Sequence, residues 1–134
     1  MHFVFGVVRD KDIRGIGNAI FPVATSIHLT PLVNTRSAAP AEVAAMHKRY
    51  APRMKTHSIM REALRAAWKE CSASGLVVVT GSLYLVGELL LFVQANSPPP
   101  KKILARISRE GHSEAIGCRL QVSSCRLKPA TWNL

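Results

Sequence analysis

The pattern of apolar and polar positions is most informative in residues 75–90, Gly-Leu-Val-Val-Val-Thr-Gly-Ser-Leu-Tyr-Leu-Val-Gly-Glu-Leu-Leu. The run of valines is typical of a strand that is covered on both faces, because β-branched side chains suit a buried, pleated surface. Thr80, Gly81 and Ser82 interrupt the run with small residues that favour a turn. Apolar positions in residues 83–90 then return at helical spacing. This stretch therefore predicts a strand, a tight turn and a helix.

Apolar runs and helical repeats alternate in the same way along the rest of residues 1–95. Such alternation is typical of a parallel sheet with helices on both faces and right-handed crossover connections. We therefore predict an α/β domain of three layers with a mostly parallel sheet. The expected strands are residues 2–8, 26–29 and, at a sheet edge, 53–56, and the expected helices are residues 12–21, 40–51 and 60–71, the last with Ser58 as its N-cap.

A membrane-spanning helix is the competing interpretation of residues 75–93, which are long enough to cross a bilayer. Glu88 lies within this stretch, and the Thr-Gly-Ser turn divides it into two shorter segments. Because both features disrupt a spanning helix, we favour the buried strand followed by a helix and expect no membrane partner.

The composition fits one globular domain followed by a basic tail. The chain has 134 residues, of which 48% are hydrophobic, and this is enough to form one core. Residues 96–100, Asn-Ser-Pro-Pro-Pro, are typical of a linker. We predict a domain over residues 1–95 that is incomplete at its N-terminus, and a Pro-rich linker and poorly ordered basic tail over residues 96–134. Within this tail, residues 103–107 are expected to form one short helix.

The charge of the tail raises the question of a nucleic-acid partner. The net charge is +10, and about half of it follows residue 98. Trp132 is the single aromatic residue of the tail, so no platform for stacking bases is evident. We expect a solvated tail and no nucleic-acid binding.

Two further features concern localisation and metal binding. The chain opens without a basic, apolar leader, which favours the cytoplasm. Its three cysteines lack metal-type spacing.

Four stretches carry a more specific pattern, in the order Phe-Gly-Val-Val-Arg-Asp-Lys-Asp (5–12), Leu29-Thr30 with Arg36, Arg-Glu-Ala-Leu (61–64) and Val-Thr-Gly-Ser-Leu-Tyr-Leu-Val-Gly-Glu (79–88). They resemble the C-terminal domain of folylpolyglutamate synthases, which are often bifunctional with dihydrofolate synthase and belong to the Mur ligase superfamily. The resemblance covers roughly residues 2–93, and the last of the four strings is its most specific part.

The resemblance implies a Rossmann-like fold of the Mur ligase C-terminal domain type. It also implies a reaction, in which ATP phosphorylates a folate or pteroate carboxylate and the amino group of glutamate attacks the acyl phosphate to form an amide. ATP and Mg²⁺ are the cofactors of the full-length family enzyme. The C-terminal domain of the family closes over the ATP site and supplies the glutamate-binding side.

The chain departs from this family in what it lacks. No glycine-rich phosphate loop with a Gly-Lys-Ser/Thr ending occurs in the sequence, and the family's magnesium ligands and modified lysine have no counterpart. We therefore expect a truncated domain that is inactive alone, holds no cofactor by itself and has an N-terminal ATPase domain as its missing partner. The alternative is a non-catalytic α/β interaction module whose basic tail binds an anionic partner.

Three residues are candidates for the glutamate side, by resemblance. The hydroxyl of Ser82 is expected to face an open cleft at the carboxyl edge of the sheet, although the same residue would serve as the N-cap of the last helix. Lys11 follows the first strand and suits a carboxylate or phosphate, unless it pairs with Asp10 or Asp12. Arg36 follows the second strand and is expected to reach the same edge or to remain solvated.

Other polar residues receive no catalytic or metal-binding assignment. His28, His47 and His57 do not cluster in the sequence, and His47 lies on an apolar helix face, as is typical of a satisfied core histidine. Glu88 is expected either to contact Lys11 or Arg36 or to extend to solvent. No partner for general-base chemistry is evident beside it.

Overall fold

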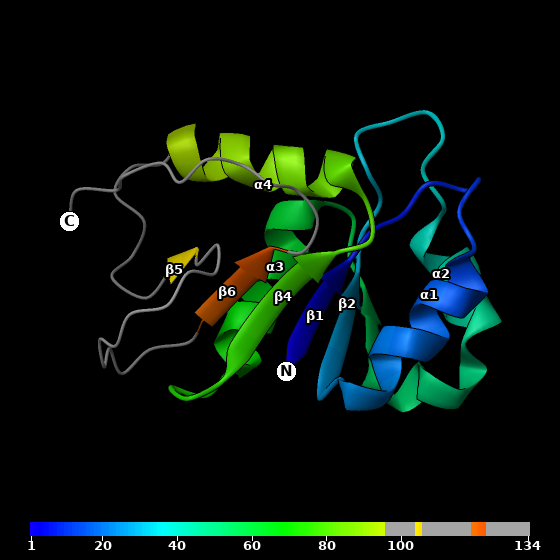
Figure 1. The fold of residues 1–134 in the computed structure, drawn as a ribbon, viewed down its shortest axis with the longest axis horizontal. Coiled ribbons are helices and arrows are strands. Elements are labelled where there is room, and N and C mark those ends of the chain that lie inside the picture. The colour runs from blue at the N-terminus through cyan, green and yellow to red at the C-terminus, as the bar shows by residue number, and fades with distance from the viewer. Residues whose placement is uncertain (96–103, 106–118, 123–134) are drawn as a thin grey trace.

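The computed structural model describes residues 1–95, 104–105 and 119–122, and these residues form one parallel sheet with the strand order β3-β2-β1-β4-β6-β5 (Figure 1). Every strand pair in it is parallel. The strands are β1 His2–Phe5, β2 Ser26–Leu29, β3 Met54–Thr56, β4 Leu76–Thr80, β5 Leu104–Ala105 and β6 Arg119–Val122. The helices are α1 Ile13–Ile20, α2 Pro40–Met46, α3 Met60–Glu70 and α4 Leu83–Ala95, and the short 3-10 helices are η1 Phe21–Val23 and η2 Lys48–Arg53.

The predicted fold class is confirmed, and the predicted order of elements through α4 is observed. Strand β2 has its predicted bounds, and β3 lies at a sheet edge as expected. The helix predicted over residues 40–51 is shorter, because the backbone leaves the helical region at His47 and continues as the 3-10 helix η2. The prediction of Ser58 as N-cap is wrong. Ile59, in an extended conformation and without a side-chain cap, precedes α3 instead.

The tail contributes two strands to the sheet within its described residues. Strand β6 pairs with β4, and β5 pairs with β6. The short helix predicted around residues 103–107 is therefore wrong at Leu104–Ala105, which are in strand β5. Residues 96–103, 106–118 and 123–134 lie outside the described residues, so the domain boundary at residue 95 stays a prediction.

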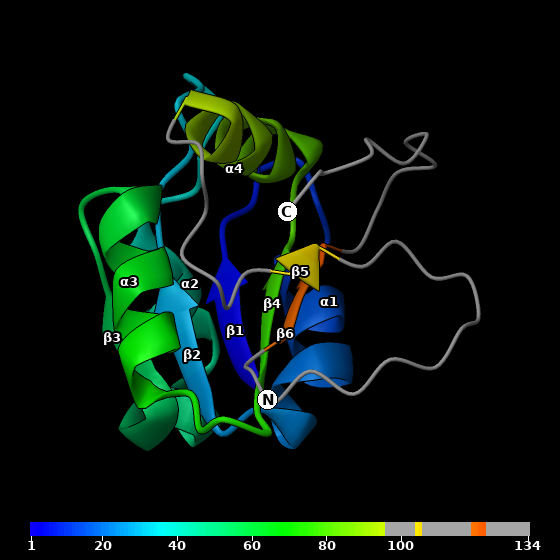
Figure 2. The same cartoon turned by 90° about the vertical axis from the view of Figure 1, so that its left-hand side faces the viewer.

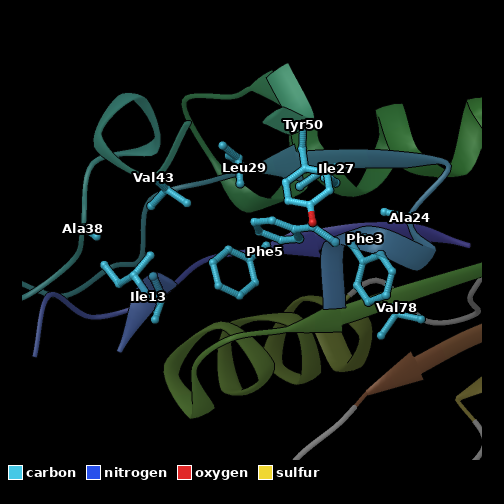
Figure 3. Packing of buried hydrophobic residues seen from close by; sticks show 12 residues of the cluster. Phe3, Phe5, Ile13, Ala24, Ile27, Leu29, Ala38, Val43, Tyr50 and Val78 are labelled. Carbon is cyan, nitrogen blue, oxygen red and sulfur yellow. The ribbon is translucent and has the colours of Figure 1, made fainter. Parts of the chain in front are cut away.

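The two faces of the sheet carry separate apolar clusters, because successive side chains of a strand point to opposite faces. On one face, Phe3 and Phe5 of β1 pack with residues from β2, α1, η1, α2 and η2 (Figure 3). On the other face, Val4 packs with residues from β4, α3 and α4. Figure 2 shows α1 and α3 on opposite sides of the sheet, which gives the predicted three layers.

The backbone at Gly6 and the backbone at Gly81 cross closely and hold the carboxyl ends of β1, β2 and β4 near one another. Gly81 has φ +113°, and a Cβ atom built on it would lie 2.5 Å from the carbonyl oxygen of Gly6. The Gly6 N–H donates to the Thr80 carbonyl at 3.3 Å, and the Thr30 N–H donates to the Phe5 carbonyl at 3.0 Å. Only glycine tolerates both the conformation and the contact at residue 81.

The competing membrane interpretation of residues 75–93 finds no support. In the part of the chain that the structure describes, no helix has both the length and the apolar character needed to cross a membrane. The valine run forms β4 and the following apolar repeat forms α4, as the sequence predicted.

Two glycine substitutions test the backbone crossing. Gly81→Ala should lower the free energy of unfolding by about 2 kcal/mol or more, because the new methyl group meets a backbone oxygen and the positive φ is strained. Gly87→Ala should raise it by roughly 0.5–1 kcal/mol, since Gly87 is helical and nothing lies within 4 Å of the added Cβ. Urea unfolding measures both. Equal stability of Gly81→Ala and the wild type would contradict the crossing.

Candidate functional site

Three loops meet at the carboxyl edge of the sheet, the place where open parallel sheets bind ligands. Asp10 follows β1, Arg36 follows β2, and Tyr84 lies in the first turn of α4, after β4. The Arg36 guanidinium donates from Nη1 to Asp10 Oδ2 at 2.9 Å and from Nη2 to the Tyr84 hydroxyl at 3.4 Å. Arg36 therefore reaches this edge and joins the three segments, and its side chain also stays largely exposed, so both alternatives considered from the sequence hold in part.

Backbone hydrogen bonds fix the position of Arg36. Its N–H donates to the Asn34 side-chain oxygen at 2.8 Å, and its carbonyl accepts from the Arg9 N–H at 2.9 Å. The hydrogen bond to Tyr84 and the charge of Asp10 raise the pKa of Arg36 further above its ordinary value. The side chain is 57% exposed. It keeps N–H donors beyond those used by Asp10 and Tyr84, so a carboxylate from solvent could bind them.

Ser82 directly follows Gly81, the glycine of the backbone crossing, and it is buried rather than exposed as expected. The residue is only 7% exposed, and its Oγ accepts from the Tyr84 N–H at 3.3 Å. It therefore serves as the N-cap of α4, which was the alternative interpretation. The expectation that its hydroxyl faces an open cleft is wrong, because Ser82 is buried. Its assignment to the glutamate side stays a prediction.

Lys11 lies exposed at the same edge. Its two neighbouring aspartates are engaged elsewhere, since Asp10 pairs with Arg36 and Asp12 caps α1 by accepting from the Gly15 N–H at 2.9 Å. Among the described residues, the Lys11 ammonium forms no ion pair, so the pairing considered from the sequence is not observed. A positive charge thus remains available at this edge of the sheet.

Two other polar side chains singled out from the sequence do not belong to this edge. Burial raises the pKa of Glu88, and the charge of Arg61 opposes that shift, so Arg61 is its charged neighbour rather than Lys11 or Arg36. His47 is buried, and its Nε2 lies 3.1 Å from the Ile13 carbonyl oxygen. The expectation of a satisfied core histidine is confirmed.

The structure gathers a row of polar side chains that the sequence analysis missed, on the sheet face covered by α3. The Nδ1 atom of His2 lies 2.8 Å from Ser26 Oγ, which lies 2.9 Å from His28 Nε2. His28 Nδ1 in turn lies 3.0 Å from His57 Nε2. The alternation Ser26-Ile-His28 was the available signal, because two polar residues two apart in a buried strand share one face.

Glu70, the last residue of α3, completes this row. Its Oε2 lies 3.4 Å from His28 Nε2, and its Oε1 accepts from Lys55 Nζ at 2.6 Å. Burial lowers the pKa of His2 and of His57, and it lowers the pKa of His28 to about 4. For Glu70, burial acts to raise the pKa, but the hydrogen bond from Lys55 and the proximity of His28 produce a net lowering.

A group of three potential metal ligands lies in this row. Within residues 1–95 and the two described tail segments, one group of three such side chains has its ligand atoms within 4.8 Å of one another: His2, His28 and Glu70. Asp10 and Asp12 belong to no such group there.

Comparisons with known proteins give matches among solved structures only. No family model matches the chain, and no curated protein matches it. The fold is similar to that of the bifunctional folylpolyglutamate synthase/dihydrofolate synthase from Yersinia pestis CO92, with a TM-score of 0.62 and 22% identity over 69% of this chain and 22% of that chain. That enzyme has also been solved with AMPPNP and a manganese ion.

Two further structures agree. E. coli FolC in complex with ADP gives a TM-score of 0.61 and 23% identity, over 71% of this chain and 23% of that chain. Mycobacterium tuberculosis folylpolyglutamate synthase complexed with ADP gives a TM-score of 0.58 and 25% identity, over 68% of this chain and 23% of that chain. The chain thus spans less than a quarter of the length of these proteins. The resemblance seen in the sequence is confirmed, at the level of the fold.

The lowered pKa of His28 in the polar row predicts that the free energy of unfolding decreases at acidic pH. The pKa of His28 is about 4 in the fold and 6.5 when unfolded, so the unfolded chain binds more protons below pH 6.5. His28 alone should then lower the free energy of unfolding by about 3 kcal/mol between pH 7.5 and pH 4. Urea titrations in chelator-containing buffer measure this slope. His28→Gln should flatten it, and equal slopes for both proteins would contradict the prediction.

Proposed function

We propose that the chain is the glutamate-side part of a folylpolyglutamate synthase/dihydrofolate synthase, an ATP-dependent ligase that joins glutamate to a folate or pteroate carboxylate through an acyl phosphate. The fold supports this proposal, since the similar structures in three bacteria carry these enzyme names. The chain covers 22–23% of their length, so the nucleotide side of the reaction belongs to residues outside it.

The observation that carries the proposal is the bridge from Asp10 through Arg36 to Tyr84. It places a fixed guanidinium at the carboxyl edge of a parallel sheet, where a small ligand would meet three loops at once. Arginine suits a carboxylate because its planar group donates two parallel N–H bonds. Glutamate offers two carboxylates, and Lys11 adds a second positive charge at the same edge.

Each residue has a defined task in this proposal. Arg36 binds and orients a carboxylate of glutamate, while Asp10 and Tyr84 hold the guanidinium in place. Lys11 increases the local positive potential and stays solvated until a ligand arrives. Ser82 fixes the first turn of α4, and thereby the Tyr84 hydroxyl, by capping that helix. The amine of the bound glutamate would then be presented to an acyl phosphate held by the missing part of the enzyme.

A glutamate titration tests this arrangement. Addition of L-glutamate to the full 134-residue chain should shift backbone NMR signals at residues 10–12, 36 and 82–84. Arg36→Gln should weaken binding about tenfold or more, because it removes a charge-assisted hydrogen bond. Arg65→Gln, an exposed site on α3, is the matched control and should bind like the wild type.

Two results would contradict the proposal. One is glutamate binding with equal affinity in Arg36→Gln and wild type, or shifts confined to other parts of the fold. The other concerns the expected inactivity of the chain, which should release no ADP when it is incubated with ATP, Mg²⁺, tetrahydrofolate and glutamate. ADP release that requires glutamate would contradict this expectation, because the nucleotide side of the reaction would then not be missing.

A further inference from the structure

One end of the polar row under α3 lies at the side of the sheet opposite to the carboxyl edge. His2 opens β1, Ser26 opens β2, and Glu70 ends α3, so these residues meet near the amino ends of the strands. The register pairs His2 directly with Ser26 across the two parallel strands. This cluster has no part in the proposed glutamate site, and its composition of two histidines and a carboxylate calls for a separate explanation.

The spacing of the cluster suits a tetrahedral metal ion. Zinc bonds of roughly 2.0–2.2 Å at tetrahedral angles put neighbouring ligand atoms about 3.4 Å apart. His28 Nε2 and Glu70 Oε2 are separated by 3.4 Å. The ligand atom of His2 lies within 4.8 Å of both. The Ser26 hydroxyl lies 2.8 Å from His2 Nδ1 and 2.9 Å from His28 Nε2, so a bound ion would displace it from between the two rings. Three protein ligands then leave one position for water.

The surrounding groups support the two central ligands. His28 Nδ1 lies 3.0 Å from His57 Nε2, so when His28 Nε2 binds an ion its Nδ1–H has an acceptor that fixes the ring. Lys55 binds Glu70 through Oε1, which leaves Oε2 for an ion. The side chain of His28 is fully buried, whereas that of Glu70 is 31% exposed and opens the site to solvent.

Positive groups nearby weaken the attraction for a cation without occupying the site. The N-terminal ammonium acts on His2, and it donates to the Thr25 hydroxyl at 3.2 Å. The Lys55 ammonium is the closer charge, but its side chain is 55% exposed, so water screens it. Neutral imidazoles suit zinc better than magnesium or calcium, which prefer oxygen ligands.

We propose that His2, His28 and Glu70 bind one Zn²⁺ ion, which ties the C-terminal end of α3 to strands β1 and β2. The histidines bind as neutral imidazoles, each through the ring nitrogen that carries no proton, and no oxidation or reduction takes place. The ion stabilises the folded chain, because the unfolded chain does not hold the three ligands together. The site is independent of the glutamate edge, and either proposal can fail while the other stands.

Zinc titration of the full, metal-free chain tests the proposal. Competition with a chromophoric zinc chelator should show one ion per chain, and zinc should raise the Tm. Substitution by Co²⁺ should give the intense visible absorption of a tetrahedral complex. His2→Gln and Glu70→Gln keep hydrogen-bonding capacity, and each should weaken zinc binding at least tenfold, with the Co²⁺ band lost.

Two more variants separate this site from other zinc binding by the chain. Glu42→Gln, an exposed carboxylate on α2, should leave the affinity unchanged. Lys55→Met should tighten binding a few-fold, because it removes the nearest competing charge. Absence of stoichiometric zinc binding would overturn the proposal. Zinc affinity that is the same in wild type, His2→Gln and Glu70→Gln would also overturn it, since other residues of the chain would then hold the ion.

Discussion

The close crossing of Gly6 and Gly81 is the constraint on which the rest of the structure depends. The Gly6 carbonyl leaves no room for a side chain at residue 81, and the backbone there adopts φ +113°. This contact brings the loop after β4 against the end of β1. The Thr30 N–H bond to the Phe5 carbonyl adds the end of β2. The bridge from Asp10 through Arg36 to Tyr84 can form because these three strand ends are held together.

The parallel sheet separates two kinds of polar chemistry. At the carboxyl edge, the charged side chains are exposed, and Arg36 and Lys11 supply positive charge to solvent. Under α3, the imidazoles of His2 and His28 are buried and that of His57 is half-buried. The pKa values of all three are lowered, so they are neutral near pH 7. The first environment suits a soluble anion, and the second suits an ion that binds neutral nitrogen ligands. One alternation of side chains along β1 and β2 produces both the apolar core and the buried row.

The sequence predicted the parts of this structure that depend on local patterns. The valine run, the helical repeat after residue 82 and the order of the elements were sufficient for a parallel three-layer α/β fold. The capping role of Ser82 was foreseen as an alternative for the same reason. The burial of Ser82 was not foreseen, because burial depends on contacts between segments that are distant in sequence.

The contacts that define both sites join residues far apart in the chain. Arg36 and Tyr84 are separated by 48 positions, and His2 and Ser26 by 24. Their pairing depends on strand register, which a single sequence does not specify at the level of individual atoms. The histidines therefore appeared unclustered until the register of β1 and β2 placed them in one row. Helix ends were also less predictable, as at Ile59, because a nearby serine is only a statistical signal for a cap.

The central claim is that the carboxyl edge of the sheet binds an amino dicarboxylate through Arg36. A crystal of the full chain grown with L-glutamate tests it most directly. Electron density for a carboxylate is expected within hydrogen-bond distance of the Arg36 guanidinium, with Asp10 and Tyr84 still in contact with it. Glutamate bound elsewhere on the molecule, with this edge filled by water alone, would contradict the role of Arg36.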